Sequence, residues 1–139
     1  MSTDFMSLIA TDSVRFARSK NLINKASGTY NIIRLPHFAF VREIVLVETV
    51  AYAGGAIDGT ISIGFTGNGE VADVDGFMTV AHAQAAVVGS RKMSDDIAAA
   101  WYAGKWFNTA GGQVTITFTT GTCTTLVTGV VFCEYYVIH

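Results

Sequence analysis

The sequence predicts an all-β protein: an antiparallel β-sandwich of jelly-roll type, with about six to eight strands and one short helix. Two observations carry this prediction. Short segments rich in Val, Ile, Thr and aromatic residues recur at intervals of roughly ten residues, with Gly, Asn and Asp between them. Strand-like segments also do not alternate with long helical ones, as they would in a protein built from βαβ units.

The first 28 residues differ from the rest of the chain. They are polar with scattered apolar residues, and they fit neither the helical nor the strand period. We interpret residues 1–28 as an extended N-terminal arm, with one strand near Ser13–Ala17, and residues 29–139 as a single sandwich domain. An ordered arm must be docked on something, because free chain ends usually fray.

Three strands are expected in the first half of the sandwich. Tyr30–Leu35 is followed by Pro36, which closes it. Phe40–Ala51 is apolar on both faces, which indicates that both faces are covered. Ile61–Phe65 alternates apolar residues with Ser and Gly, as a half-buried strand does.

The middle of the chain is less regular, and two strands follow it. A short strand around Gly76–Val80 or a short helix through Ala81–Ala86 fits the middle. Ser94 is a candidate N-cap for a helix over Ile97–Tyr102. Gln113–Thr120 alternates apolar and Thr residues, and Thr125–Ile138 is the last strand, with Gly129 as a site for a bulge.

The composition favours assembly. Half of the residues are apolar (50%) and only 14% are charged, whereas ordinary soluble domains hold about 25% charged residues. Such a chain exposes much apolar surface, which a second subunit or a partner would cover. The alternative is a monomer with a surface rich in Ser, Thr and Gly.

The charges are unevenly distributed. Residues 1–28 carry four basic and two acidic residues, and the remainder carries five basic and nine acidic ones. Six acidic residues and no basic one lie between Glu43 and Ser90. This separation suits head-to-tail contact between subunits. The net charge of -2 and the lack of a basic patch argue against a nucleic-acid partner.

The cysteines indicate a reducing compartment, and the hydropathy bears on secretion and membrane insertion. Cys123 and Cys133 would lie too far apart along one strand for a disulfide, so we expect free thiols. No secretory signal is expected, and no apolar run is long enough to span a membrane.

The sequence holds few residues of the types that act as catalytic acids, bases or nucleophiles in enzymes. The histidines are His37, after the proline, His82, in the irregular middle, and His139, the last residue. Motifs of hydrolases, nucleotide-binding proteins and zinc enzymes are absent from the sequence. We therefore expect no enzyme activity and no cofactor. A small enzyme on a jelly-roll frame would need His82 or His37 beside acidic residues in a pocket.

One acidic stretch resembles the start of a calcium-binding loop. It reads Asp73-Val74-Asp75-Gly76, but the twelfth position, which would be Glu in such a loop, is Gln84. A turn with solvated carboxylates is the better interpretation, and no metal is expected. Glu70, Asp73 and Asp75 remain weak candidates for a cation site between subunits.

Two sets of residues are candidates for contact with partners. In the arm these are aromatic and basic residues: Phe5, Arg15, Phe16, Arg18, Lys20 and Lys25. In the sandwich they are aromatic residues: Trp101, Trp106, Tyr135 and Tyr136. Trp101 and Trp106 have few polar neighbours, so a core or interface position fits them better than a sugar-binding platform.

The chain also resembles a known class of proteins over roughly residues 39–137. The resemblance is a pattern of glycines, strands and an aromatic ending, carried by these segments: Val41-Arg42-Glu43-Ile44, Asp75-Gly76-Phe77, Ala103-Gly104-Lys105-Trp106-Phe107, Gly111-Gly112-Gln113-Val114-Thr115-Ile116-Thr117 and Glu134-Tyr135-Tyr136. They are similar to β-sandwich head decoration (cement) proteins of tailed phages. The arm is not covered.

The resemblance implies a non-enzymatic protein of the virion, assembled in the host cytoplasm. Such proteins bind the outer capsid surface, often as homotrimers, and stabilise the lattice of major capsid proteins. The expected partners are therefore the chain itself and the major capsid protein, with no nucleic acid and no membrane. The alternative is a receptor- or carbohydrate-binding β-sandwich module of a phage tail or fibre.

Overall fold

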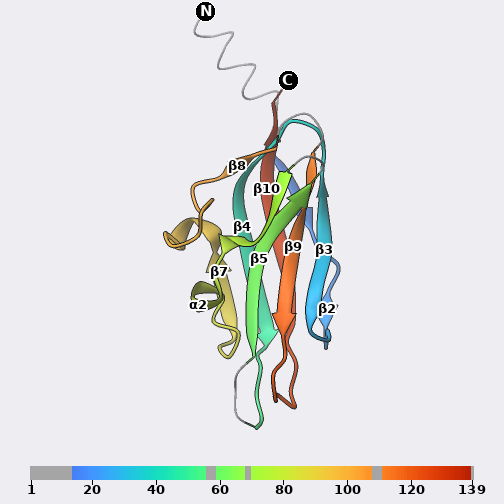
Figure 1. The fold of residues 1–139 in the computed structure, drawn as a ribbon, viewed down its shortest axis with the longest axis vertical. Coiled ribbons are helices and arrows are strands. Elements are labelled where there is room, and N and C mark those ends of the chain that lie inside the picture. The colour runs from blue at the N-terminus through green and yellow to red at the C-terminus, as the bar shows by residue number, and fades with distance from the viewer. Residues whose placement is uncertain (1–13, 56–58, 68–69, 108–110, 139) are drawn as a thin grey trace, which may run out of the picture.

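The computed structural model describes residues 14–55, 59–67, 70–107 and 111–138, which form two β-sheets packed face to face (Figure 1). The elements in chain order are β1 (Arg15–Arg18), β2 (Leu22–Ile23), β3 (Gly28–Leu35), β4 (Ala39–Val50), β5 (Thr60–Gly67), β6 (Glu70–Met78), the one-turn helix α2 (Val80–Ala83), β7 (Gly89–Lys92), the 3₁₀ turn η1 (Met93–Asp95), β8 (Lys105–Trp106), β9 (Gly112–Thr119) and β10 (Thr128–Val137). The predicted all-β sandwich is confirmed.

The strand order is that of a jelly roll. Sheet A runs β1-β10-β4-β7, with β2 also on β10 and β8 also on β4, and sheet B runs β3-β9-β5-β6. Every pairing is antiparallel. Pairs nest along the chain: β5 with β6, β4 with β7, β3 with β9, and β1 with β10. The chain is therefore one long ribbon of paired strands rolled into two layers.

The core lies between the two sheets and comes from alternate residues of their central strands. Ile44 and Leu46 of sheet A and Ile63 and Ile116 of sheet B are almost fully buried. Each such side chain contributes roughly 1.5–3 kcal/mol on burial. At one end the rings of Phe65, Phe77 and Phe107 fill the layer, with centroids 5.4–6.4 Å apart.

The strands predicted from alternation are found close to their predicted bounds. Tyr30–Leu35 lies in β3, Phe40–Ala51 in β4, Ile61–Phe65 in β5 and Gln113–Thr120 in β9. The last strand, β10, begins at Thr128, three residues after the predicted start. Gly129 was expected to mark a bulge or a close approach: the register shifts beside it, with the extra residue Thr49 on β4, and a Cβ on Gly129 would lie 2.5 Å from the Val47 carbonyl oxygen.

The middle of the chain differs from the prediction. Both alternatives for it occur: β6 ends at Met78, and α2 follows as a single turn that ends where Gln84 takes a left-handed conformation. The prediction of a helix over Ile97–Tyr102 is wrong, because these residues form turns and a bend. Asp96 is buried instead, and its Oδ2 accepts hydrogen bonds from the Thr79 backbone N–H (2.6 Å) and Oγ1 (2.8 Å). A tertiary contact thus uses the carboxylate that would have begun the helix.

Residues 14–28 of the predicted arm are described, and they include two strands of sheet A. β1 and β2 both pair with β10. Between them Ser19 is buried, its N–H donates to the Val131 carbonyl (2.8 Å), and its Oγ accepts from the Val131 N–H (3.0 Å). Residues 1–13, with Phe5, lie outside the described residues. The division of the chain at residue 28 stays a prediction.

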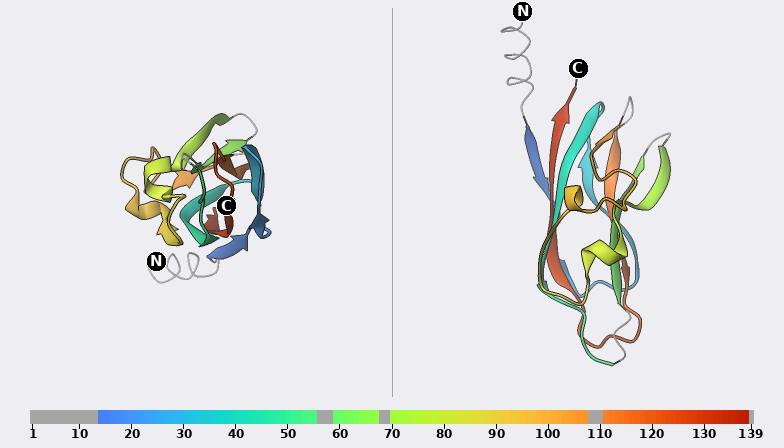
Figure 2. Two further views of the ribbon diagram at one scale, coloured as in Figure 1. Left: turned by 90° about the horizontal axis from the view of Figure 1, so that it is seen from below. Right: turned by 90° about the vertical axis from the view of Figure 1, so that its left-hand side faces the viewer.

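The two open sides of the sandwich are covered differently. The segment 79–104, with α2 and η1, covers the side of β6 and β7, as the right-hand view of Figure 2 shows. The opposite side, between β2 and β3, carries only the short β2 segment (Figure 1).

No helix in the described part of the chain is long and apolar enough to cross a membrane.

Candidate interaction surface

The outer face of sheet A is apolar. In β10 the side chains of Val131 and Cys133 point into the core, so Phe132 between them points outward. By the same alternation the outer face holds a set of aromatic and branched residues, which we call the aromatic face: Phe16, Phe40, Val45, Val47, Trp106, Val130, Phe132 and Tyr136. Phe16 is 78% exposed and Trp106 51% exposed. Large apolar groups exposed together mark a site of association.

The register of the strands arranges this face in rows. One row crosses four strands: Arg18 of β1, Phe132 of β10, Val45 of β4 and Lys92 of β7. A second row crosses three strands and is aromatic throughout: Tyr136, Phe40 and Trp106. Neighbours in a row lie within contact distance on one face of a sheet. A third row, formed by Phe16, Glu134 and Glu43, lies between these two, so the aromatic face also carries two carboxylates.

Basic groups flank the aromatic face. Arg18 lies over the Phe132 ring, 5.7 Å from its centroid, and Lys92 ends the same row on the far edge. Arg42 lies over Tyr136 (6.0 Å) and forms an ion pair with Glu134 at 3.1 Å. Glu134 is thus paired within the chain, and Glu43, its register neighbour on the same face, accepts hydrogen bonds from Ser94.

The outer face of sheet B is polar. Its register rows consist of short polar residues and glycine: Thr29, Thr117 and Ser62; Asn31, Thr115 and Gly64; Arg34, Gln113 and Thr66. Thr29 and Thr117 share a hydrogen bond between their hydroxyls (2.9 Å). Gly64 allows β6 to bend over this face, because a Cβ there would overlap the Asp73 carbonyl. The sandwich is therefore two-sided, with one apolar and one polar outer face.

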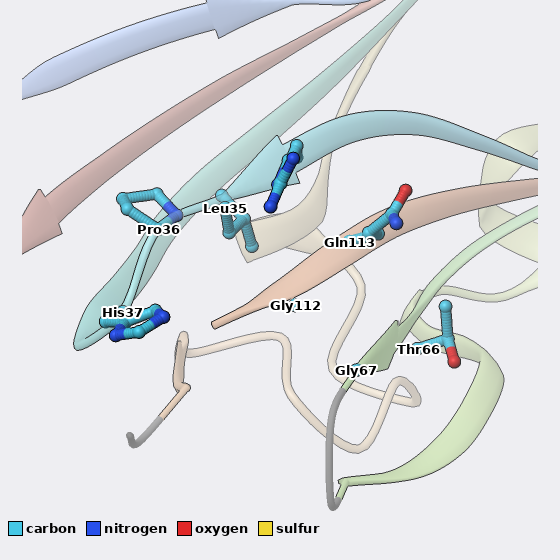
Figure 3. Close-up of a pocket in the computed structure, with 8 residues that line it drawn as sticks. Leu35, Pro36, His37, Thr66, Gly67, Gly112 and Gln113 are labelled. Atoms are coloured by element: carbon cyan, nitrogen blue, oxygen red, sulfur yellow. The ribbon is translucent and has the colours of Figure 1, made fainter. Parts of the chain in front are cut away.

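A pocket of about 560 Å³ lies at one end of the polar face (Figure 3). Its lining includes Arg34, Gln113 and Thr66, which are register neighbours, and His37 at the β3–β4 turn. No carboxylate is among the lining residues that the structure describes. The pocket offers hydrogen-bond donors to an oxygen-rich group, but no nucleophile paired with a base.

The histidines are not brought together in the described residues. His37 is exposed at this pocket, whereas His82 lies in α2, where its Nε2 and the Lys92 carbonyl oxygen lie 2.7 Å apart. His139 lies outside the described residues. The arrangement that an enzyme on this frame would need, His82 or His37 beside acidic residues in a pocket, is not formed by these two residues.

The acidic stretch from Glu43 to Ser90 does not form one surface. Glu43 accepts hydrogen bonds from the backbone N–H and Oγ of Ser94. Glu48 is 1% exposed, and neither carboxyl oxygen has a hydrogen-bond partner in the described part of the chain. Burial raises the pKa of Glu48 to about 8, and the nearby Arg91 charge offsets this only in part. Asp73 and Asp75 lie on β6, where Asp75 is exposed and Asp73 half-buried.

The candidate cation ligands lie on β6. The side chains of Asp73 and Asp75 are hydrogen-bonded to each other, which raises the pKa of Asp75. No group of three or more His, Cys, Asp or Glu residues that could hold a metal ion occurs among the residues the structure describes. The side chain of Glu70 lies outside that description.

Both cysteines are free thiols, as predicted. Cys133 is buried in β10, where desolvation raises the pKa of its thiol to about 12. Cys123 is half-buried before the last strand. A thiol with a raised pKa is a poor nucleophile, so Cys133 has a packing role.

Several of the predicted contact residues gather on the aromatic face. These are Phe16, Arg18, Trp106 and Tyr136, and Arg15 is exposed beside them on β1. Five residues of the face did not appear among the predicted contact residues: Phe40, Val45, Val47, Val130 and Phe132. The sequence held part of the information, because Phe132 alternates with Val131 and Cys133 and so faces away from the core side of its strand.

The other predicted contact residues lie elsewhere. Tyr135 faces inward and packs against the core. Trp101 lies in the loop after η1, with its ring centroid 4.3 Å from the Lys105 Nζ, which also lies near Phe65 and Phe107. Lys20 and Lys25 line a groove between β2 and β3. Trp101 and Trp106 therefore do not form one ring platform.

Comparison with known proteins identifies the fold. No protein-family model matches the sequence, and no curated protein sequence does. The structure is similar to a chain of the cyanophage Pam1 capsid asymmetric unit, at 15% identity and a TM-score of 0.66, covering 91% of this chain and 86% of that one. It is also similar to a chain of the acidic stable capsid structure of Helicobacter pylori bacteriophage KHP30, at 18% identity and a TM-score of 0.58, covering 88% and 86%. The chain thus shares its fold with chains of phage capsid structures.

Proposed function

We propose that this chain is a non-enzymatic structural protein of a bacteriophage virion. In this proposal it binds the outer surface of the capsid with its aromatic face and stabilises the lattice of major capsid proteins. The observation that carries the proposal is the difference between the two outer faces of the sandwich, in a fold shared with chains of phage capsid structures.

The aromatic face supplies the binding energy. Aromatic side chains bury large areas and dominate the energetics of protein interfaces. Arg18, Arg42 and Lys92 around the face favour an acidic patch on the capsid, because complementary charges speed encounter and fix orientation. Many copies bound to one lattice would raise the overall avidity well above the affinity of a single contact.

The polar face then points away from the capsid. Several of its polar side chains already bond within the chain: Thr29 and Thr117 share a hydrogen bond, and the Ser62 Oγ donates to the Val74 carbonyl. At one edge of the aromatic face, Arg15 and Phe16 on β1 would contact a neighbouring capsid subunit. This gives the predicted arm residues a role in joining subunits as well as in binding one of them.

Capsid binding by charged variants of the aromatic face tests the proposal. Phe16→Asp and Trp106→Asp each place a carboxylate at an exposed position on opposite edges of the face, on β1 and β8. Because an unpaired charge would be buried on docking, each variant should bind at least about tenfold more weakly to capsids lacking this protein. Ile97→Asp is the matched control, since Ile97 is 79% exposed in the loop after η1, outside the aromatic face.

The bound protein is measured by co-sedimentation with capsids, and circular dichroism verifies that each variant is folded. Equal binding by the wild type, the two face variants and the Ile97→Asp control would rule out the aromatic face as the contact surface. The capsids should also resist heating better with the wild-type protein than with either face variant, because a bound protein stabilises the lattice.

One observation favours a second candidate, a carbohydrate-binding module of a tail or fibre. The row of Tyr136, Phe40 and Trp106 presents three aromatic residues side by side on one face, and sugars stack on such rings. A glycan array separates the two candidates. Glycan binding that is lost in Trp106→Ala, without capsid binding by the wild type, would favour the module; an array without hits would favour the capsid protein.

A further inference from the structure

The open side of the sandwich between β2 and β3 holds a groove of about 330 Å³. Its lining combines apolar and basic residues: Leu22, Tyr30 and Ile32, with Lys20, Lys25, Asn21 and Asn31. Lys25 lies over the Tyr30 ring, with its Nζ 5.4 Å from the ring centroid. Within the described part of the chain, no carboxylate lines the groove and neither lysine forms an ion pair.

This chemistry defines what would fit. The lysines favour carboxylates at the rim of the groove, and the apolar side chains favour a branched aliphatic residue within it. A segment that alternates Val with Asp meets both requirements. The groove also lies beside the edge strand β3, whose outer backbone groups are not used by sheet B.

β6 of the same chain has this composition. It reads Glu70-Val71-Ala72-Asp73-Val74-Asp75, and Val71 and Val74 are exposed. Asp73 and Asp75 lie close enough to share a hydrogen bond. Two carboxylates held this close repel each other when both are ionised, and a cation from another molecule would relieve that repulsion.

The groove and β6 cannot meet within one molecule. β3 and β6 are the two opposite edges of sheet B, with β9 and β5 between them. A contact between these surfaces must therefore join two copies. It would be heterologous, because the surface used on one copy differs from that used on the next, and contacts of this kind close into rings when the rotation permits.

We propose that the chain associates head to tail with copies of itself, the acidic edge strand β6 of one copy docking on the lysine groove between β2 and β3 of the next. The contact leaves the aromatic face free, since that face is the outer surface of the other sheet. The proposal does not rest on the role in the capsid, because it concerns a different surface.

Charge reversal on the full chain, followed by sedimentation velocity over a range of concentrations, tests the proposal. Lys20→Glu with Lys25→Glu reverses the groove, and Asp73→Lys with Asp75→Lys reverses the strand. Each pair should shift the protein to the monomer, with at least a tenfold rise in the apparent dissociation constant. The chain carrying all four changes should associate again, because both surfaces have exchanged sign.

Mixing supplies a second test. The groove variant and the strand variant, each monomeric alone, should associate when mixed, since every contact in the mixture can pair opposite charges. Arg34→Glu with Lys92→Glu is the control, because it reverses two charges outside the groove and should leave association unchanged. Raised salt should weaken the wild-type contact, as it screens exposed charges.

Three results would each overturn the head-to-tail proposal. A wild-type chain that stays monomeric at every concentration would overturn the proposal. So would groove and strand variants that associate as the wild type does. If the fourfold variant and the mixture both stay monomeric although circular dichroism shows folded protein, the copies do not meet head to tail through these two surfaces.

Discussion

Glu48 is a carboxyl group placed inside a hydrophobic core. It lies on β4, nearly without exposure, and its oxygens have no hydrogen-bond partner within the described residues. The charge of Arg91 acts on Glu48. The charges of Cys123, Glu48 and Tyr30 act on the neighbouring Tyr52. The Tyr52 hydroxyl is buried without a partner as well, and desolvation raises its pKa to about 12. The folded protein therefore holds both groups neutral near pH 7.

The raised pKa of Glu48 makes stability depend on pH. Its pKa is 4.5 ordinarily and about 8 in the folded chain, so between these values the unfolded chain releases a proton that the folded chain keeps. The free energy of unfolding should therefore be highest near pH 4.5 and fall as pH rises to about 8. The loss from this group is at most roughly 5 kcal/mol.

Glu48→Gln should remove this part of the pH dependence. The amide is nearly the same size and cannot ionise, so the variant should be more stable than the wild type above pH 8 and similar to it near pH 4.5. Urea unfolding from pH 4.5 to 8.5 measures the difference, with Asp95→Asn, at an exposed position, as the control. Parallel pH profiles for the wild type and Glu48→Gln would show that Glu48 titrates normally.

At the scale of the element, alternation was sufficient to predict the long strands. β3, β4, β5 and β9 each have eight or more residues, and a stretch of this length reveals its buried face through the period of two. β2, β7 and β8 have two to four residues. The sequence of β7, Gly-Ser-Arg-Lys, has no apolar residue, so only its pairing with β4 makes it a strand.

The helix predicted over Ile97–Tyr102 failed for a different reason. Asp96 has the residue type and position of a helix first turn, but its carboxylate is committed to Thr79 at the start of α2. No local pattern could reveal this, because the two residues are 17 positions apart. The contact fastens the loop after η1 to the end of β6.

Asp96→Ala should therefore loosen this loop and destabilise the protein. Two donors of Thr79 would lose a charged acceptor, which costs about 2–3 kcal/mol when the groups are buried. Asp95→Ala is the matched control, because Asp95 is adjacent and exposed. Chemical denaturation gives the free energies, and equal effects of the two substitutions would mean that the Asp96 contact contributes little.

At the scale of the whole molecule, the candidate site was predictable by residue type and not by position. Phe16, Trp106 and Tyr136 were named from their aromatic character, but Phe132 joins them only through the register of β10 with β1 and β4. That register shifts between Glu134 and Tyr135. The extra residue at this shift is Arg42 of β4, so alternation along β10 continues, with Tyr135 inside and Tyr136 outside, and the register sets only that Tyr136 lies opposite Phe40.

The two proposed surfaces lie on different parts of one rigid sandwich, so their functions should separate. Phe16→Asp should lose capsid binding and keep self-association, because the groove between β2 and β3 and the strand β6 are unchanged. Lys20→Glu with Lys25→Glu should lose self-association and keep the capsid-binding surface: the chain becomes monomeric, and its aromatic face is unchanged. Without linked neighbours it loses avidity, so its binding curve should move to higher concentration.

Saturation distinguishes the two kinds of loss. At high protein concentration the groove variant should reach the same number of copies per capsid as the wild type, because each capsid site still accepts one aromatic face. Phe16→Asp should remain far below that number. Titration of capsids followed by quantitative gel analysis measures both. If the two variants lose capsid binding and self-association together, the surfaces are not independent, and one continuous interface would serve both contacts.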